Sequence, residues 1–202
     1  MRPLYTFLFT LICLGAHIGA TSQAHAILPK FGLKLGTETW NSSIDGSPNG
    51  TLSTGLATVS MNLLIVNLEG NLGLHNSTAA GSRNDPLGFS NFENLELVTA
   101  LIGRVNIPIV PLIASGSFGA GIDQRVMLSQ THVLTDKTID DASLTRTMLP
   151  ISAMVSAGIP KIISFYLEAR FNLELTNSYS LNGAERELDK NHELWFLFGA
   201  TF

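Results

Sequence analysis

The sequence is poor in cysteine and in charged residues. Cys13 is the only cysteine among the 202 residues, so the rest of the chain can form no disulfide, cysteine zinc site or cysteine nucleophile. Charged residues make up 14% of the chain, the formal net charge is −4 and no run of Lys or Arg occurs. This composition excludes the basic footprint of a nucleic-acid-binding protein, and 45% hydrophobic residues exclude a disordered chain.

The length suggests one domain, preceded by a secretory signal peptide over residues 1–26. Arg2 supplies one positive charge, residues 4–16 are apolar, and Ala24 and Ala26 are small residues of the kind that a signal peptidase reads. The apolar stretch is shorter than the roughly 20 residues that a membrane-spanning helix needs. We therefore expect cleavage near Ala26, which leaves residues 27–202 as the mature protein.

A second uncharged stretch, residues 105–122, is not predicted to be a helix. It contains Pro108 and Pro111 and then Gly116, Gly119 and Gly121, which break helices. We predict a turn that leads into a strand.

Alternation of apolar and polar residues dominates the mature chain and predicts strands. In residues 162–176, Phe165, Leu167 and Phe171 fall on one face, whereas Glu168 and Arg170 fall on the other. This pattern continues for much longer than the five or six residues of an ordinary strand. It is long enough for a tilted strand that crosses a lipid bilayer.

Weaker repeats of the pattern bring the total to about eight strands. The predicted connections alternate between short (residues 62–65, 105–110 and 158–161) and long (residues 41–53, 76–92, 124–143 and 177–191). Tight turns at one end and longer loops at the other are typical of an up-and-down transmembrane barrel. We predict an all-β protein, an eight-stranded antiparallel up-and-down transmembrane β-barrel.

The predicted polar faces carry charges of both signs, which decides which face points inward. A soluble lipocalin-like barrel would place its apolar face inside, but the narrow interior of an eight-stranded barrel is filled by side chains, and paired charges suit that interior. We predict a charge network in the barrel interior (the lumen) formed by Lys34, Glu38, Glu69, Glu96, Arg104, Glu168, Arg170 and Glu174. A plug of salt bridges and an ion pathway are both compatible with this set.

The chain ends on alternating Leu194, Phe196, Phe198 and Ala200, followed by the terminal Phe202. This ending resembles the C-terminal signature of the small, eight-stranded bacterial outer-membrane β-barrel proteins. The resemblance implies a cell outer membrane location, contact with outer-membrane lipid, and recognition of the last strand by the barrel-assembly machinery. The residues of that signature here are Leu194, Phe196, Phe198 and Phe202; Ala200 stands where an aromatic residue is often found.

The chemistry-bearing residues predict no enzyme. His75 and Ser77 form a His-x-Ser pair similar to that of outer-membrane lipid A deacylases, but the pair lies on the predicted inward face, where a rim histidine is the simpler interpretation. Trp40, Tyr179 and Trp195 are candidates for residues at the membrane interface, and an ordinary packing role is equally compatible with each of them. Trp195 falls on the predicted inward face, where it could fill the lumen. The sequence predicts no catalytic or metal-binding residues and gives no reason to expect a cofactor.

We therefore expect a non-enzymatic outer-membrane barrel with a structural role, a surface-interaction role through its long loops, or limited passage of small solutes. An extracellular partner would bind through those loops, and no nucleic acid is expected. The alternatives are an outer-membrane lipid-modifying hydrolase that uses His75 and Ser77, and a soluble periplasmic lipocalin-like binder of an apolar ligand.

Overall fold

A computed structural model describes residues 29–42, 53–63, 66–80, 91–110, 113–132, 137–159, 162–186 and 190–202. The predicted signal peptide over residues 1–26 lies outside the described residues. Within the described ranges there is no helix that is long and apolar enough to cross a lipid bilayer.

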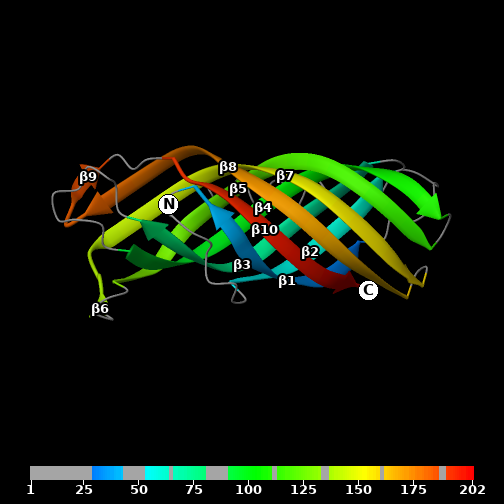
Figure 1. The fold of residues 1–202 in the computed structure, drawn as a ribbon, viewed down its shortest axis with the longest axis horizontal. Helices are drawn as coiled ribbons and strands as arrows, with labels where there is room; N and C mark the ends of the chain where they lie inside the picture. Colours follow the sequence, from blue (N-terminus) through cyan, green and yellow to red (C-terminus); the bar gives the residue numbers. More distant parts are fainter. Residues whose placement is uncertain are drawn as a thin grey trace.

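Eight long antiparallel strands in the described part of the chain form a closed ring (Figure 1). They are β1 (Lys30–Asn41), β2 (Thr54–Leu63), β3 (Val66–Ala80), β4 (Asn91–Val110), β5 (Ala114–His132), β7 (Ala142–Ile159), β8 (Ile163–Leu181) and β10 (His192–Thr201). Each strand pairs with its neighbours along the chain, and β10 pairs with both β8 and β1. This closure confirms the predicted up-and-down barrel.

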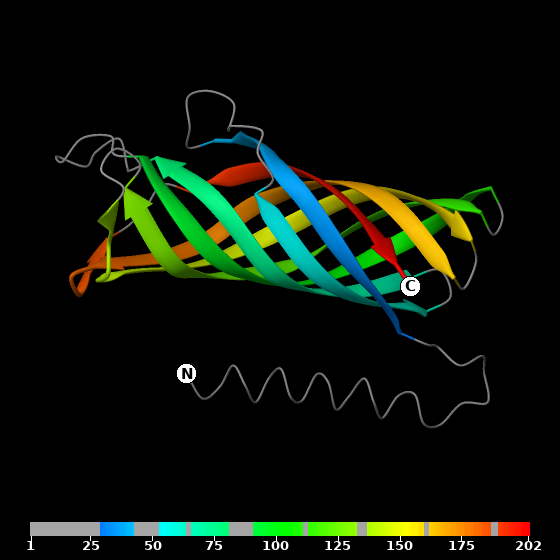
Figure 2. The same ribbon diagram turned by 90° about the horizontal axis from the view of Figure 1, so that it is seen from below.

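Two short strands are added at one end of the ring. β6 (Lys137–Thr138) pairs with the end of β5, and β9 (Ala184–Arg186) pairs with the end of β8. Both lie at the left end in Figure 1, the end at which β3, β5 and β8 finish and β4, β7 and β10 begin. We call this the loop end of the barrel and the opposite end, where β2–β3, β4–β5 and β7–β8 are joined, the turn end. Figure 2 shows β1 and β10 side by side as they close the ring.

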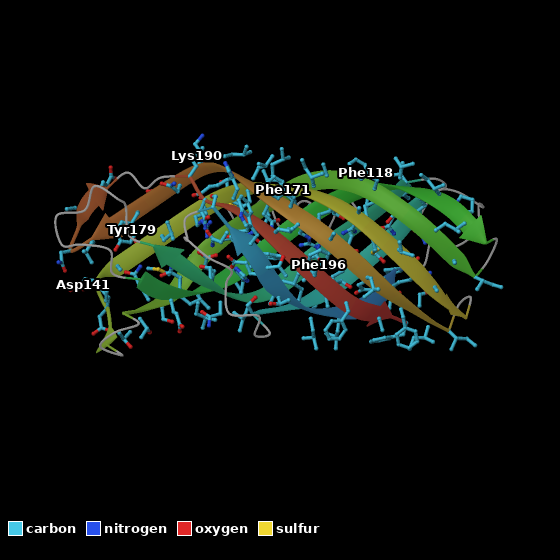
Figure 3. The ribbon with its side chains drawn as sticks, in the orientation of Figure 1. Phe118, Asp141, Phe171, Tyr179, Lys190 and Phe196 are labelled. Atoms are coloured by element: carbon cyan, nitrogen blue, oxygen red, sulfur yellow. The ribbon has the colours of Figure 1, made fainter. Side chains whose placement is uncertain are left out.

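The strands alternate between the lumen and the outside, with the apolar face outward. Leu167 is 69% exposed and Phe118 is 59% exposed, whereas Glu168 and Arg170 are almost completely buried. Figure 3 shows Phe118 at the edge of the barrel among side chains that project away from the wall. This arrangement confirms the predicted apolar-out orientation and is the reverse of that in a soluble barrel.

The outward apolar face of β8 is tall enough to cross a membrane. It runs from Ile163 to Leu175, twelve residue steps. At about 3.3 Å per step and a tilt of about 40°, these steps span roughly 30 Å, the thickness of the hydrocarbon core. Beyond Leu175 towards the loop end, the exposed residues of β8 include Thr176 and Ser178, so the polar end of the strand lies beyond this apolar band.

Among the described strands, register shifts occur where the apolar band ends. They fall between Glu38 and Trp40 in β1, between Leu95 and Glu96 in β4, and between Thr147 and Met148 in β7. At each shift one strand carries an extra residue, as in a β-bulge, which reverses the alternation beyond it. A fourth shift lies between Pro108 and Val110, at the turn end.

Several predicted strand boundaries are wrong. Residues 105–110 were predicted as a connection, yet β4 continues through Pro108 to Val110. This is possible because the ladder between β3 and β4 ends at the Val66–Val105 pair, so Pro108 needs no N–H bond on that side. Likewise β3, β5 and β8 extend into the predicted loops as far as Ala80, His132 and Leu181. In β3 and β8 polar residues continue the strand beyond the apolar band, whereas in β5 Val126 and Leu128 keep the outward face apolar.

Candidate functional site

The lumen is the candidate functional site because it holds the buried charges of the described chain. All eight residues of the predicted network are buried there: Lys34, Glu38, Glu69, Glu96, Arg104, Glu168, Arg170 and Glu174. Two separate groups of ion pairs are found among the described residues rather than one network. We call them the turn-end cluster (Lys34, Glu69, Arg104, Glu168 and Arg170) and the loop-end cluster (Glu38, His75, Glu96, Asp123, Arg125, Arg146, Glu174 and Glu193).

The turn-end cluster joins three cations to two carboxylates. Lys34 contacts Glu69 and lies 2.6 Å from Glu168 Oε2. Arg104 bridges the same two acids, with its Nη1 2.7 Å from Glu69 and its Nη2 2.7 Å from Glu168. Arg170 Nε donates to Glu168 Oε1 at 2.9 Å. Since these side chains come from β1, β3, β4 and β8, the cluster cross-links opposite walls of the barrel.

The loop-end cluster is organised by two arginines on β5 and β7. Arg146 lies 3.0 Å from Glu96, 3.4 Å from Glu174 and 2.9 Å from Glu193. Arg125 donates to Asp123 at 3.0 Å and to Glu193 at 2.7 Å. Glu193 therefore accepts from both arginines and connects β10 to β5 and β7.

Trp195 separates the two clusters. Its indole is completely buried and lies 4.5 Å from the Arg125 guanidinium of the loop-end cluster and 6.0 Å from that of Arg170 in the turn-end cluster. Leu56, Val98 and Leu197 form a buried apolar cluster with it. The lumen thus contains two ion-paired layers with an apolar layer at Trp195, and the side chains of each layer are almost inaccessible to solvent.

At the turn end, the lumen opens into a cavity of about 420 Å³ with a mixed polar and apolar lining. Its lining includes Asn62, Asn106, Ser156 and Tyr166, and it reaches Glu69 of the turn-end cluster. The cavity therefore ends at the first layer of ion pairs.

The predicted charge network lacked four of its members: Asp123, Arg125, Arg146 and Glu193. Asp123 and Glu193 fall on the polar side of the alternation in their strands, but no sequence pattern indicates their partners. Arg125 fell within the predicted connection 124–143, because the strand was expected to end near Asp123. Two-residue spacing of Asp123 and Arg125 was the signal that could have extended the inward face of that strand.

The structure also corrects the placement of two side chains. Tyr179 is buried in the lumen and donates to Gln130 at 3.2 Å, so it is no interface residue. The cause is the register shift in which Thr147 pairs with Thr176 but Met148 pairs with Glu174, which reverses the alternation of β8. His75 is no rim residue, because β3 continues past it to Ala80 and its ring is completely buried.

The two tryptophans lie on opposite sides of the wall. Trp40 is outward and 42% exposed, and its ring lies 6.1 Å from that of Phe171. Trp195 lies inside the lumen, the position that the alternation of the last strand predicts.

The C-terminal residues of the assembly signature form the outer face of β10. Phe196, Phe198 and Phe202 are between 50% and 67% exposed, and Leu194 alternates with them on the same face. Phe202 also exchanges two backbone hydrogen bonds with Phe31 at the start of β1. The last residue of the chain therefore completes the closing ladder.

Comparison with known proteins supports the fold. The structure is similar to that of Neisserial surface protein A (NspA), with a TM-score of 0.53, 10% sequence identity, and coverage of 86% of this chain and 94% of NspA. The N-terminal β-barrel domain of Pseudomonas aeruginosa OprF also matches, with a TM-score of 0.46, 11% identity, and coverage of 86% of this chain and 97% of that domain. No protein-family model matches the sequence, and no curated protein matches it. In its fold, the chain is a closed, eight-stranded antiparallel up-and-down β-barrel similar to that of NspA.

Proposed function

We propose that the chain is a non-enzymatic barrel of the cell outer membrane, exported by the signal peptide over residues 1–26 and embedded in lipid as residues 27–202. The main support for the proposal is that the closed wall has its apolar face outside and its charged face inside, the reverse of a soluble protein. Large apolar side chains such as Leu167 and Phe118 are exposed outside, and ion pairs are buried inside. Closure satisfies the backbone hydrogen bonds that lipid cannot.

The outer surface also offers a place for acyl chains. A groove of about 900 Å³ has a largely apolar lining that includes the outward residues Phe118, Val155, Leu167 and Phe198, with the small Gly116 among them. Hydrocarbon chains of outer-membrane lipid would fill such a groove without leaving polar groups unpaired.

Within this proposal, the role is structural or concerned with surface interaction rather than solute passage. The turn-end cluster, the layer at Trp195 and the loop-end cluster follow one another along the lumen. A solute would have to disrupt buried ion pairs such as Arg104–Glu168, which are 2.7 Å apart, and separating a buried pair costs several kcal/mol. An extracellular partner would bind the four connections of unequal length at the loop end. The barrel-assembly machinery would recognise the C-terminal strand.

The two alternative functions have less support. A hydrolase acting on lipid needs a nucleophile that faces the membrane, but the side chains of His75 and Ser77 are buried in the lumen. A lipocalin-like binder needs an apolar interior, whereas this interior holds most of the buried charges.

The test is fractionation of cells that express the full chain, with the membrane fraction run on a gel both unheated and boiled. We expect recovery in the outer membrane and faster migration before boiling, since a closed barrel resists detergent until heated. Recovery in the soluble periplasmic fraction would contradict the proposal.

A further inference from the structure

Three buried side chains of the loop-end cluster converge in a way that ion pairing does not explain. Glu38 of β1, His75 of β3 and Glu193 of β10 each offer one ligand atom, and these three atoms lie within 4.8 Å of one another. The side chains are between 0% and 3% exposed. The convergence brings β3 together with β1 and β10, the two strands that pair where the barrel closes.

The distances suit a metal ion better than hydrogen bonds. His75 Nε2 lies 3.3 Å from Glu38 Oε2 and 3.7 Å from Glu193 Oε2, beyond the 2.7–2.9 Å typical of a charge-assisted N–H···O bond. Zinc ligands lie about 2.1 Å from the metal at tetrahedral angles, which sets adjacent ligand atoms roughly 3.4 Å apart. The two distances bracket that value.

The buried nitrogen itself points to a ligand. His75 Nε2 has no hydrogen-bond partner, and neither has Glu38 Oε1. The other ring nitrogen, Nδ1, is 2.8 Å from Thr54 Oγ1. A neutral imidazole that donates from Nδ1 to this hydroxyl keeps its lone pair on Nε2, as metal-binding histidines do.

The charge balance of the loop-end cluster also favours a cation. Its acids are Glu38, Glu96, Asp123, Glu174 and Glu193, against only two arginines. When His75 is neutral and all five acids are ionised, five carboxylates against two guanidiniums leave an excess of three negative charges in a buried volume, which a bound cation or protonation of an acid must compensate. A divalent cation removes two of the three.

We propose that Glu38, His75 and Glu193 bind one divalent transition-metal ion, with zinc as the best match, inside the loop end of the barrel. The metal clamps β1, β3 and β10 together across the closing seam. Glu193 is the weakest ligand, because its Oε2 already accepts from Arg125 and Trp195. The imidazole in the donor set selects a transition metal over Ca²⁺ or Mg²⁺.

The test is metal binding by the full chain refolded in detergent with Zn²⁺ present, because the buried ligands favour loading during folding. After dialysis against metal-free buffer, we expect one zinc per folded barrel by elemental analysis. The folded fraction is measured on the same sample by gel mobility before and after boiling. A wild-type barrel that folds but retains no zinc would overturn the proposal and leave the membrane role standing.

Matched variants separate ligation from charge. Glu38→Gln and His75→Gln are expected to lose the bound zinc. Glu174→Gln removes one negative charge from the same cluster, as Glu38→Gln does, but is expected to retain the zinc. Thr54→Val removes the partner of His75 Nδ1 and is expected to weaken zinc binding about 10- to 100-fold. It also serves as the decisive variant if the ligand variants do not fold. Equal zinc retention by Glu38→Gln or by Thr54→Val and the wild type would refute the assigned site.

Discussion

Replacement of Leu167 by arginine tests the proposed membrane face of the barrel. Leu167 is 69% exposed and pairs with Val155 of β7 and Phe198 of β10, both of which are also exposed apolar residues. It lies four residue steps above Ile163, or about 10 Å along the membrane normal within a band of roughly 30 Å. An arginine there would enter the hydrocarbon core.

The expected cost is about 2–4 kcal/mol, the value for Arg on the lipid face near the midplane. That cost corresponds to a roughly 30- to 1000-fold lower folding equilibrium constant. Ser143→Arg is the matched control, because Ser143 is exposed on β7 near the loop end. We expect this control to stay within about 0.5 kcal/mol of the wild type.

The assay is reversible unfolding by guanidinium chloride in phospholipid vesicles, followed by tryptophan fluorescence and by gel mobility. If Leu167→Arg costs no more than Ser143→Arg, the lipid-facing assignment of β8 is wrong. In a soluble barrel with the same exposed Leu167, both substitutions would be close to neutral.

Further predictions concern the lumen, the wall and the last residue. Glu168→Gln removes a carboxylate shared by three cations and should cost about 3–5 kcal/mol in the same unfolding assay; a cost as small as that of Glu185→Gln, an exposed control, would exclude the turn-end cluster as a stabilising plug. Gly73→Ala should cost about 1–3 kcal/mol by overpacking, since an added Cβ would lie 2.0 Å from the Gly55 carbonyl oxygen, whereas at Gly70 the nearest atom is 3.9 Å away; equal effects of Ala at both positions would contradict the tight inner wall. The wild-type barrel should give no ion conductance in planar bilayers, and stable channels would contradict the closed lumen. Phe202→Ser should lower the fraction assembled in the outer membrane of living cells but leave stability in vesicles within about 0.5 kcal/mol; unchanged assembly would argue against recognition of the C-terminal strand.

The alternation of apolar and polar residues was sufficient to predict the fold, because each strand keeps its period of two residues within the apolar band. The inward Glu168 and outward Leu167 are neighbours in the sequence and lie on opposite sides of the wall, as the period of two requires. The same reasoning placed Trp195 on the inward face, although an aromatic residue alone would have suggested the membrane interface.

The prediction failed where bulges and the polar loop end begin. Counting in steps of two places Tyr179 outside, because no sequence signal shows that Thr147 and Met148 pair with Thr176 and Glu174. Arg125 was assigned to a loop because three consecutive polar residues, Asp123, Gln124 and Arg125, interrupt the alternation of β5. The outward face continues beyond them with Val126 and Leu128, which are 41% and 54% exposed.

The candidate metal site could not be predicted from the sequence, for a different reason. Glu38, His75 and Glu193 are far apart along the chain and have none of the short spacings of a metal-binding motif. They meet only because β10 closes the ring against β1. Closure, rather than any local pattern, produces the cluster.

The inside–outside assignment is tested most directly by the two tryptophans, because the chain contains only Trp40 and Trp195. A Trp→Phe substitution at one position gives a variant in which the other tryptophan is the only one. Both single-tryptophan variants are folded into vesicles whose lipids carry brominated acyl chains. Bromine quenches tryptophan emission on contact, so we predict strong quenching of Trp40 and little quenching of Trp195. Quenching of Trp195 as strong as that of Trp40 would contradict the inside–outside assignment on which the account rests.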